Sequence, residues 1–312
     1  MPERAITYIG VDIAKTNFVA DLSGTSASFA QTEQGHASFI KRVPADACVV
    51  CEATGGYEAS LVEALWAAKI PVAIVMPKRV RFYAKSLGLL AKTDPIDARL
   101  LSGYARACAD TLRLYQPLSQ AADQLRELLR ARDELIEQIK IEANHAEHPS
   151  KHPLLAKQAA KRHHLFDQQL EQIQAAIKTL VAADPSLHQR SERVQQIQSI
   201  GPVSAWTILA EMPELGSLKK GQPSCLLGVA PFCQDSGSTS AQRHISGGRP
   251  RARRVLYMAA VSAAQHNPIL KPFYQRLRSK GKSPKIALVA VMRKLVELIN
   301  LTLKYPNFLL AQ

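Results

Sequence analysis

The sequence predicts an α/β domain with a mixed sheet, followed by a helical hairpin and a mainly α C-terminal region. Two changes in the apolar pattern indicate this division. Short β-rich runs and amphipathic segments fill residues 1–115, and from Leu118 the apolar residues recur at steps of three and four. After Asp184-Pro185 the chain is punctuated by Gly and Ser to its end. We therefore expect domains at 1–115, 116–184 and 185–312.

The first domain begins with strands and then alternates strands with helices. Strands are expected at 6–11, 18–22, 26–31, 48–51 and 72–76. Helices are expected at 36–42, 58–69 and 78–87. This order indicates a sheet with both antiparallel and parallel neighbours. Cys48 and Cys51 lie three apart in one strand, so we expect their thiols to point to opposite faces and to pack rather than bind zinc.

The middle domain has the pattern of two amphipathic helices joined by a short polar loop. Apolar residues keep the three- and four-residue step over 118–145 and again over 166–180, with Pro149 and Pro153 between them. This pattern predicts an antiparallel coiled-coil hairpin. A second copy of the chain or the rest of the same chain must cover its apolar seam, and both interpretations stay open. The role of a histidine cluster near the tip is also open: His145, His148, His152, His163 and His164.

Positive charge is concentrated in the last quarter of the 312-residue chain. Lys and Arg number 40 against 26 acids, a net charge of +14. Residues 241–312 hold 14 of these bases and a single acid, Glu297, whereas the other 240 residues hold 26 bases and 25 acids. Such an asymmetry is typical of a surface that neutralises nucleic-acid phosphates.

The composition excludes several classes of protein. With 46% hydrophobic and 21% charged residues, the chain can bury a core and is not a disordered chain. No apolar run reaches the ~18 residues that a membrane span needs, and the first residues lack a signal-peptide layout. Five cysteines do not indicate a disulfide framework. We expect a cytoplasmic protein without a membrane partner.

Four carboxylates stand at the ends of predicted elements. Asp12 closes the first strand, and Glu52 closes the fourth. Asp94 is expected to cap a helix with Pro95 in its first position, and Asp97 then lies on the same face. If the two strands are parallel neighbours, Asp12 and Glu52 lie side by side where α/β sheets bind ligands. Four such acids need a cation and suit Mg²⁺, although each acid alone is typical of a solvated carboxylate or a helix cap.

A second group of residues lies in the C-terminal region. Ser236 stands beside Gly237 in a segment rich in Ser, Gly and Thr, and arginines follow it. A serine hydroxyl near guanidinium groups could attack a phosphate that they hold. A surface loop is the other interpretation of the same composition. The basic residues that we expect at nucleic-acid phosphates are Arg243, Arg249, Arg251, Arg253, Arg254, Arg293 and Lys294.

Several separated motifs, in order along nearly the whole chain, carry a family resemblance. The N-terminal motifs are YIGVDIAK at 8–15, CEATG at 51–55 and KTDPIDAR at 92–99. The C-terminal motifs are the segment 230–237 with its Ala-Pro and Ser-Gly ends, GGR at 247–249, LYM at 256–258 and MRKL at 292–295. With these motifs the sequence resembles the insertion-sequence-110 family of DEDD transposases, which are recombinases of bacterial mobile elements related to pilin-gene invertases.

The resemblance implies a fold, a site and partners. The fold is an RNase-H-like (RuvC-like) N-terminal domain in which Asp12, Glu52, Asp94 and Asp97 bind Mg²⁺ or Mn²⁺. Ser236 is the implied nucleophile, and the acids and the serine are brought together across protomers of a homo-oligomer, a dimer or a tetramer. Family members cleave and exchange donor and target DNA strands through a phosphoserine intermediate, and many use a bridge RNA. The implied protein is a cytoplasmic recombinase that associates with the nucleoid when active.

One departure and several alternatives accompany this interpretation. Residues 196–211 resemble the helix-hairpin-helix-like segment of the family, but Ser199 stands where its first glycine is usual. A metal-only RuvC-like endonuclease that cuts specific DNA structures would use the acids without the serine. A site-specific invertase of the same family would use both, and a non-catalytic nucleic-acid-binding protein would use neither. Phe82 and Tyr83, among the bases of the helix expected at 78–87, either stack on nucleic-acid bases or pack against another helix.

Overall fold

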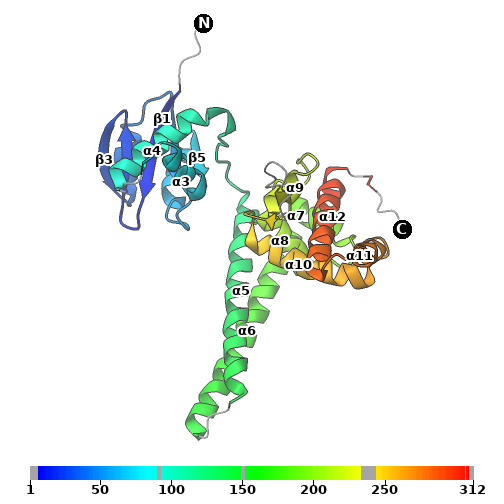
Figure 1. The fold of residues 1–312 in the computed structure, drawn as a ribbon. Coiled ribbons are helices and arrows are strands. Elements are labelled where there is room, and N and C mark those ends of the chain that lie inside the picture. Colours follow the sequence, from blue (N-terminus) through cyan, green and yellow to red (C-terminus); the bar gives the residue numbers. More distant parts are fainter. Residues whose placement is uncertain (1–5, 90–92, 149–151, 233–243, 306, 309–312) are drawn as a thin grey trace. The chain divides into compact units, whose positions relative to one another are not determined.

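A computed structural model describes the protein at residues 6–89, 93–148, 152–232, 244–305 and 307–308 (Figure 1). Its internal contacts divide the chain into two compact units, Met1–Pro117 and Leu118–Gln312. The helices of the expected middle domain belong to the second unit, and the division into three domains stays a prediction. Within the described ranges, no helix has both the length and the apolar character that a membrane span needs.

The first unit is built on a five-stranded mixed sheet in the order β3-β2-β1-β4-β5. β1 pairs antiparallel with β2 and β2 with β3, whereas β1 and β4, and β4 and β5, are parallel. The mixed sheet predicted from the sequence is thus confirmed, with strand ends within two residues of the predicted ones. The strands are β1 Thr7–Ile13, β2 Asn17–Leu22, β3 Thr25–Ala30, β4 Ala47–Glu52 and β5 Val72–Val75.

Helices cover both faces of this sheet. α1 Glu33–Ile40 and α2 Ala59–Ala67 enclose one apolar core with β-strand residues, and α3 Pro77–Ser86 and α4 Asp94–Ala107 enclose another. Cys51 lies in the first core and Cys48 in the second, which confirms that their thiols point to opposite faces. Burial raises the pKa of Cys48 to about 11 and that of Cys51 to about 12. After a short 3-10 turn at Ala109–Thr111, the Tyr115 amide donates to the Val72 carbonyl at 2.7 Å, next to the edge strand β5.

α4 lies directly on the backbone of β1. A Cβ added at Gly10 would lie 2.1 Å from the Ala98 carbonyl oxygen and 2.6 Å from the Leu101 Cβ, so only glycine allows this approach. The buried Gly10 amide donates to the Ser102 hydroxyl at 2.7 Å. This hydrogen bond joins residues 92 positions apart and fixes α4 along the strand.

The second unit begins with the predicted hairpin, α5 Gln120–Ala146 and α6 Pro153–Ala183. Pro153 opens the second helix, which starts earlier than the apolar pattern at 166–180 predicts. The remaining elements form a helical domain at the base of the hairpin (Figure 1). They are α7 Pro185–Gln195, α8 Pro202–Glu211, α9 Gln222–Leu227, β6 Pro231–Phe232, β7 His244–Ile245, α10 Pro250–His266, α11 Leu270–Ser279 and α12 Pro284–Lys304.

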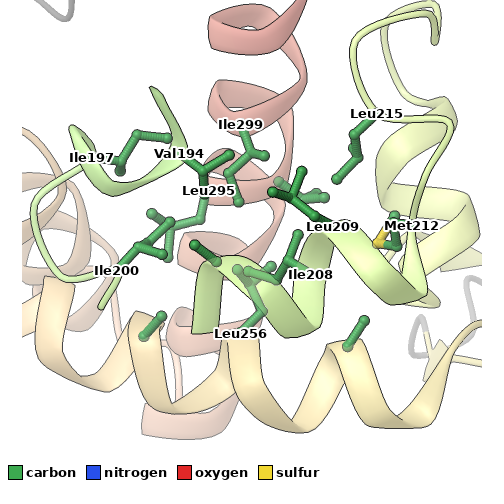
Figure 2. Packing of buried hydrophobic residues seen from close by; sticks show 14 of the residues in the cluster. Val194, Ile197, Ile200, Ile208, Leu209, Met212, Leu215, Leu256, Leu295 and Ile299 are labelled. Carbon is green, nitrogen blue, oxygen red and sulfur yellow. The ribbon is translucent and has the colours of Figure 1, made fainter. Parts of the chain in front are cut away.

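The base of the hairpin is part of the core of this domain. Leu125 and Leu129 of α5 and Ile177 and Val181 of α6 are buried in one cluster with α7, α8, α10 and α12. Figure 2 shows side chains of this cluster from α8, α10 and α12 meeting at its centre. The rest of the same chain therefore covers the seam near its base. Farther out, Ile141, Leu154 and Leu165 are exposed, and there the interpretation as a surface for a second copy stays open.

The bond between Ser102 and Gly10 gives a first prediction. Ser102→Ala should lower the free energy of unfolding by about 2 kcal/mol, because it leaves the buried Gly10 amide without its acceptor. Chemical denaturation measures the change. The matched control is Ser86→Ala in the same unit, since the Ser86 hydroxyl donates to the Tyr83 carbonyl at the surface. A loss for Ser102→Ala no larger than that of the control would contradict the role given to this bond.

Candidate functional site

Asp12 and Glu52 lie side by side on one face of the sheet. In the parallel register of β1 and β4, Gly10 is opposite Val50 and Val11 is opposite Cys51, so Asp12 and Glu52 follow at the next position. Because side chains alternate along a strand, Asp12 shares the face of Gly10, on which α4 lies. Both carboxylates are half-buried. The condition set from the sequence, that the two strands are parallel neighbours, is confirmed.

The other two acids open α4 on that same face. Asp94 is the first helical residue and Thr93 precedes it as the N-cap, so the expectation that Asp94 itself caps the helix is wrong by one position. Asp97 lies in the first turn, half-buried, and Asp94 is exposed. Asp97 directly precedes Ala98, whose carbonyl lies against Gly10. The positive end of the helix dipole lies at this turn and attracts negative charge.

The donor chemistry of these acids fits a hard divalent cation. They offer only carboxylate oxygens, the ligands that Mg²⁺ and Mn²⁺ take up in phosphoryl-transfer sites. Over the described ranges, however, no three or more His, Cys, Asp or Glu side chains are close enough to hold a metal ion together. The structure thus brings Asp12 and Glu52 together and places α4 on their face, but it does not close the four acids into one site.

Glu58 supports the turn that follows Glu52, a role that the sequence did not reveal. One of its carboxylate oxygens accepts from the Thr54 amide at 3.1 Å, the Thr54 hydroxyl at 2.9 Å and the Gly56 amide at 2.9 Å. Partial burial raises the pKa of Glu58, but these hydrogen bonds outweigh it, so the pKa lies below its usual value. In the sequence, only the position of Glu58 two residues after Gly55-Gly56 could have indicated this role. An acid at that position looks like an ordinary residue at the start of a helix.

Ser236 and Arg243 lie outside the described residues, but both ends of their segment are described. β6 and β7 pair antiparallel, with Phe232 opposite His244. Just outside this pair, the backbones of Gly228 and Gly248 are in contact, since a Cβ on Gly248 would lie 2.3 Å from the Gly228 nitrogen. Arg253 donates to the carbonyls of Gly228 at 3.3 Å and Gly247 at 2.5 Å. The two ends of the segment that carries Ser236 are therefore held together.

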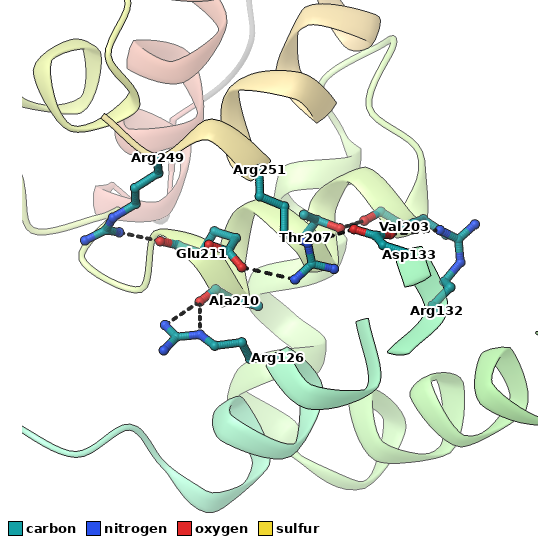
Figure 3. A network of polar contacts seen from close by, with 9 residues as sticks. All are labelled: Arg126, Arg132, Asp133, Val203, Thr207, Ala210, Glu211, Arg249 and Arg251. Atoms are coloured by element: carbon teal, nitrogen blue, oxygen red, sulfur yellow. Dashed lines mark hydrogen bonds and ion pairs between the residues drawn. The ribbon is translucent and has the colours of Figure 1, made fainter. Parts of the chain in front are cut away.

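The arginines after this segment differ in what they contact. Arg251 of α10 donates to Asp133 of α5 at 2.8 Å and to Glu211 of α8 at 3.1 Å (Figure 3). Its side chain is only 17% exposed. Arg249 donates to the Glu211 carbonyl and, with two nitrogens, to the Glu214 carboxylate. A phosphate contact by either arginine would have to displace a carboxylate. The phosphate contact that the sequence predicts for all these arginines therefore suits Arg249 and Arg251 less well than arginines outside ion pairs.

Figure 3 shows that a third arginine joins the same region of the second unit. Arg126 of α5 donates to the Ala210 carbonyl with two nitrogens, at 3.3 Å and 2.9 Å. Ala210 and Glu211 are the last residues of α8, where helix carbonyls lack intrahelical partners and the dipole favours cations. The arginines therefore cap α8 and join the hairpin to α10.

The remaining basic positions face solvent. Arg254 and Lys294 are exposed and Arg293 is half-buried, and among the described residues none of them forms an ion pair. Lys294 lies over the Phe273 ring, 4.7 Å from its centroid. Arg254 lines a groove of about 370 Å³ that begins at β7 and runs over α10 and α12. Its other lining residues are Ile245, Pro250, Arg253, Tyr257, Met258, Lys285, Val289 and Met292.

Ser199 has a backbone conformation that favours glycine. Its φ of 94° lies in the left-handed region, which favours glycine and strains other residues. The turn between α7 and α8 thus has, at Ser199, the conformation that a glycine would adopt without strain. At the tip of α5 and α6, His163 pairs with Asp167 and His152 accepts from the Leu154 amide, so both imidazoles have local partners.

Comparison with known proteins covers both groups of residues. A family model described as a transposase matches residues 9–148, and a second, described as transposase of the IS116/IS110/IS902 family, matches residues 191–275. The first range contains the four acids, and the second contains Ser236. The chain is 29% identical over 304 residues to a pilin gene-inverting protein of Moraxella bovis and 28% identical to one of Moraxella lacunata. Each alignment covers 93% of this chain and 93% of the relative.

The contact between Gly228 and Gly248 gives a second prediction. Gly248→Ala should lower the midpoint of thermal unfolding clearly more than Gly247→Ala does. Both positions have a positive φ, but a Cβ on Gly247 meets open space, whereas one on Gly248 meets backbone atoms at 2.3–2.4 Å. The extra cost should be about 1–3 kcal/mol, the range for overpacking. Equal effects of the two variants would show that this backbone contact does not form.

The difference between Arg251, which is held in ion pairs, and Arg254, which forms none among the described residues, gives a third prediction. Arg251→Gln should lower the free energy of unfolding by about 2 kcal/mol, because it removes the ion-pair partner of Glu211 and leaves Asp133 only the more distant Arg132. Arg254→Gln should change it by less than about 0.5 kcal/mol, as is usual at the surface, and should weaken binding to duplex DNA instead. Denaturation and a binding titration on both variants test this. The reverse pattern would assign the phosphate contact to Arg251.

Proposed function

Since the chain belongs to the IS116/IS110/IS902 family of transposases, and is thus a DNA transposase or recombinase, we propose that its acids and Ser236 form one strand-cleaving site. The observation that carries this proposal is the parallel pairing of β1 and β4, which puts Asp12 and Glu52 side by side under α4. The mixed sheet, with three antiparallel strands followed by two parallel ones, supports an RNase-H-like (RuvC-like) assignment.

Asp12, Glu52, Asp94 and Asp97 would hold one or two Mg²⁺ or Mn²⁺ ions. When bound, such ions polarise the scissile phosphate and stabilise the charge that develops on its oxygens. The proposed task of β1, β4 and α4 is to present these carboxylates on one face. Asp94 and Asp97, in the first turn of α4, would complete the site when DNA and the ions bind.

Ser236 would act as the nucleophile. Its Oγ loses a proton to a base and attacks the phosphorus, the bond to the 3′ oxygen breaks, and that oxygen takes up a proton. The 5′ phosphate is then joined to the serine. A 3′ hydroxyl from another strand later attacks this phosphoserine, which reseals the DNA and releases the serine. One phosphoester replaces another at each step, so no ATP is needed.

The proposed partners follow from the same site. Donor and target DNA are the substrates, and a bridge RNA that pairs with both would leave the protein to contact backbone and shape. Arg254, Arg293 and Lys294 suit such contacts, because they are not held in ion pairs within the described chain. A homo-oligomer, a dimer or a tetramer, would let acids of one protomer meet the serine of another. The reaction would take place on the nucleoid, in the cytoplasm.

Inversion of a DNA segment is the second candidate function. It is favoured by the two relatives that are named pilin gene-inverting proteins, whose similarity extends over 93% of the chain. Transposition and inversion share the strand chemistry proposed above and differ in where the two exchanged sites lie. Sequencing of the recombined DNA junctions therefore separates them.

A fourth prediction tests the nucleophile. Ser236→Ala should abolish the covalent adduct between the protein and labelled DNA, with a fall in strand exchange of about 10³-fold or more. Ser238→Ala, two residues along the same segment, is the matched control and should keep the adduct. Asp12→Asn should also remove the adduct if the acids serve the same step. Gel analysis of the denatured reaction measures all three.

The same gel decides among the alternatives. Strand cleavage that persists in Ser236→Ala without an adduct would establish water attack by a metal-only endonuclease. DNA binding by the unaltered protein without cleavage, with every divalent cation and DNA partner supplied, would establish a non-catalytic binding protein. An undiminished adduct in Ser236→Ala would remove this serine from its role.

A further inference from the structure

The surface of α3 carries a stripe of exposed residues that neither the fold nor the proposed chemistry uses. Val80 and Ala84 are the buried residues of this helix. The stripe, on the opposite side, consists of Lys78, Arg81, Phe82 and Lys85, all of them exposed. These residues are spaced by three or four positions, so they lie next to one another on one helix face.

Phe82 and Tyr83 separate the two interpretations made from the sequence. Tyr83 packs edge-to-face against Tyr104 of α4, with ring centroids 5.8 Å apart, so this residue does pack on a helix. Phe82 is 69% exposed, more than any other large hydrophobic residue in the described chain. The phenyl ring has no polar atom that water could bind, so its exposure in the middle of a charged stripe leaves an apolar ring face open to a partner.

The charge around Phe82 indicates what kind of partner this is. No acid occurs in the sequence between Glu63 and Asp94, a stretch that contains six lysines and arginines. Among the described residues, the cations of the stripe form no ion pair, whereas their neighbour Arg79 lies over the Tyr104 ring. A purely apolar partner would not suit three cations, and an anionic one alone would not use the ring. A nucleic acid satisfies both, with phosphates for the cations and base faces for the ring.

The position of α3 relates the stripe to the proposed site. β5 leads directly into α3, with Met76 as the N-cap. Val75, the last residue of β5, is paired with Glu52, and the Ala53 amide donates to the Val75 carbonyl at 3.1 Å. The helix therefore starts at the edge of the sheet where Glu52 ends its strand. α3 also shares a core with α4, which contacts Gly10 on the face of Asp12 and Glu52.

We propose that α3 binds unpaired nucleotides of the DNA strand that is cut, next to the scissile phosphate. Lys78, Arg81 and Lys85 contact its phosphates, and Phe82 stacks on a base. The nucleotides must be unpaired, because a base within a duplex has both faces covered by its neighbours. With ten residues, the helix is about 15 Å long, so it spans only a few nucleotides. This inference rests on the proposed function, since it takes the acids as the place where the strand is cut.

Binding of the full-length protein to fluorescent oligonucleotides in EDTA tests the proposal, because no metal-dependent cleavage takes place. Phe82→Ala should weaken binding to single-stranded DNA about tenfold, the usual effect of removing one stacked base contact. Phe82→Trp should restore the affinity, whereas Phe82→Leu, which keeps an apolar side chain without a ring face, should not. Binding to duplex DNA should stay as it is in the wild type. The thermal unfolding midpoint of each variant shows whether it is folded.

The salt dependence tests the cations separately. Arg81→Gln should reduce the slope of log affinity for single-stranded DNA against log salt by about 0.7, the value for one phosphate contact on a single strand. Lys41→Gln is the matched control: an exposed cation at the end of α1, which belongs to the core on the other face of the sheet. Its slope should equal that of the wild type.

Several outcomes would overturn the inference. They are wild-type binding by Phe82→Ala or Phe82→Leu, an equal loss for duplex DNA, and a loss confined to single-stranded RNA, which would replace the DNA strand by an RNA. Equal slopes for Arg81→Gln and Lys41→Gln would remove the phosphate contact. Ser236→Ala should bind like the wild type, so failure of the serine chemistry and failure of the stripe can be told apart.

Discussion

The close approach of α4 to β1 is the constraint on which the N-terminal site depends. Strand pairing alone brings Asp12 next to Glu52, but Asp94 and Asp97 arrive on a helix, which must cross the sheet closely to share their face. Gly10 permits this approach, because any Cβ there would collide with the Ala98 carbonyl. Ser102 then sets the position of the helix along the strand, since its hydroxyl accepts a hydrogen bond from the buried amide of Gly10.

The C-terminal unit places its segment by the same means. Gly228 and Gly248 let two backbones touch, and Arg253 binds the carbonyls of Gly228 and Gly247. The segment that carries Ser236 therefore begins and ends at one fixed place beside α10. In both units a contact between backbones that only glycine allows lies next to a group of residues proposed to act: at Gly10 under α4, and at Gly228 and Gly248 beside the ends of the segment. Backbone contacts of this kind allow little movement, which suits sites that must be held to within about 0.5 Å.

Periodicity was a good guide to the strands and to the pair Asp12 and Glu52, because strand alternation and parallel pairing are rules of local geometry. The Asp-Pro pair predicted Asp94 as the N-cap, whereas Asp94 is the first helical residue, since Asp and Pro are both frequent over the whole first turn of a helix. Periodicity gave no sign of Ser102, because a serine between apolar residues shows no pattern of its own. The partners of Arg251 were also hidden, since Asp133 lies 118 positions away in the sequence.

The same long-range pairing changes what the charge of the sequence means. Arg249 and Arg251 belong to the basic last quarter, but their carboxylate partners Asp133, Glu211 and Glu214 come from the part of the chain that is nearly neutral.

Folding thus uses part of the basic surplus to hold α5, α8 and α10 together, and it leaves exposed cations such as Arg254 and Lys294 for the proposed phosphate contacts. In the N-terminal unit the reverse holds. The first 240 residues are close to neutral as a whole, and yet α3 gathers Lys78, Arg81 and Lys85 on one face without an acid between Glu63 and Asp94. Net charge therefore favours a class of partner, whereas the cations left outside ion pairs provide the places on the protein where we propose that this partner binds.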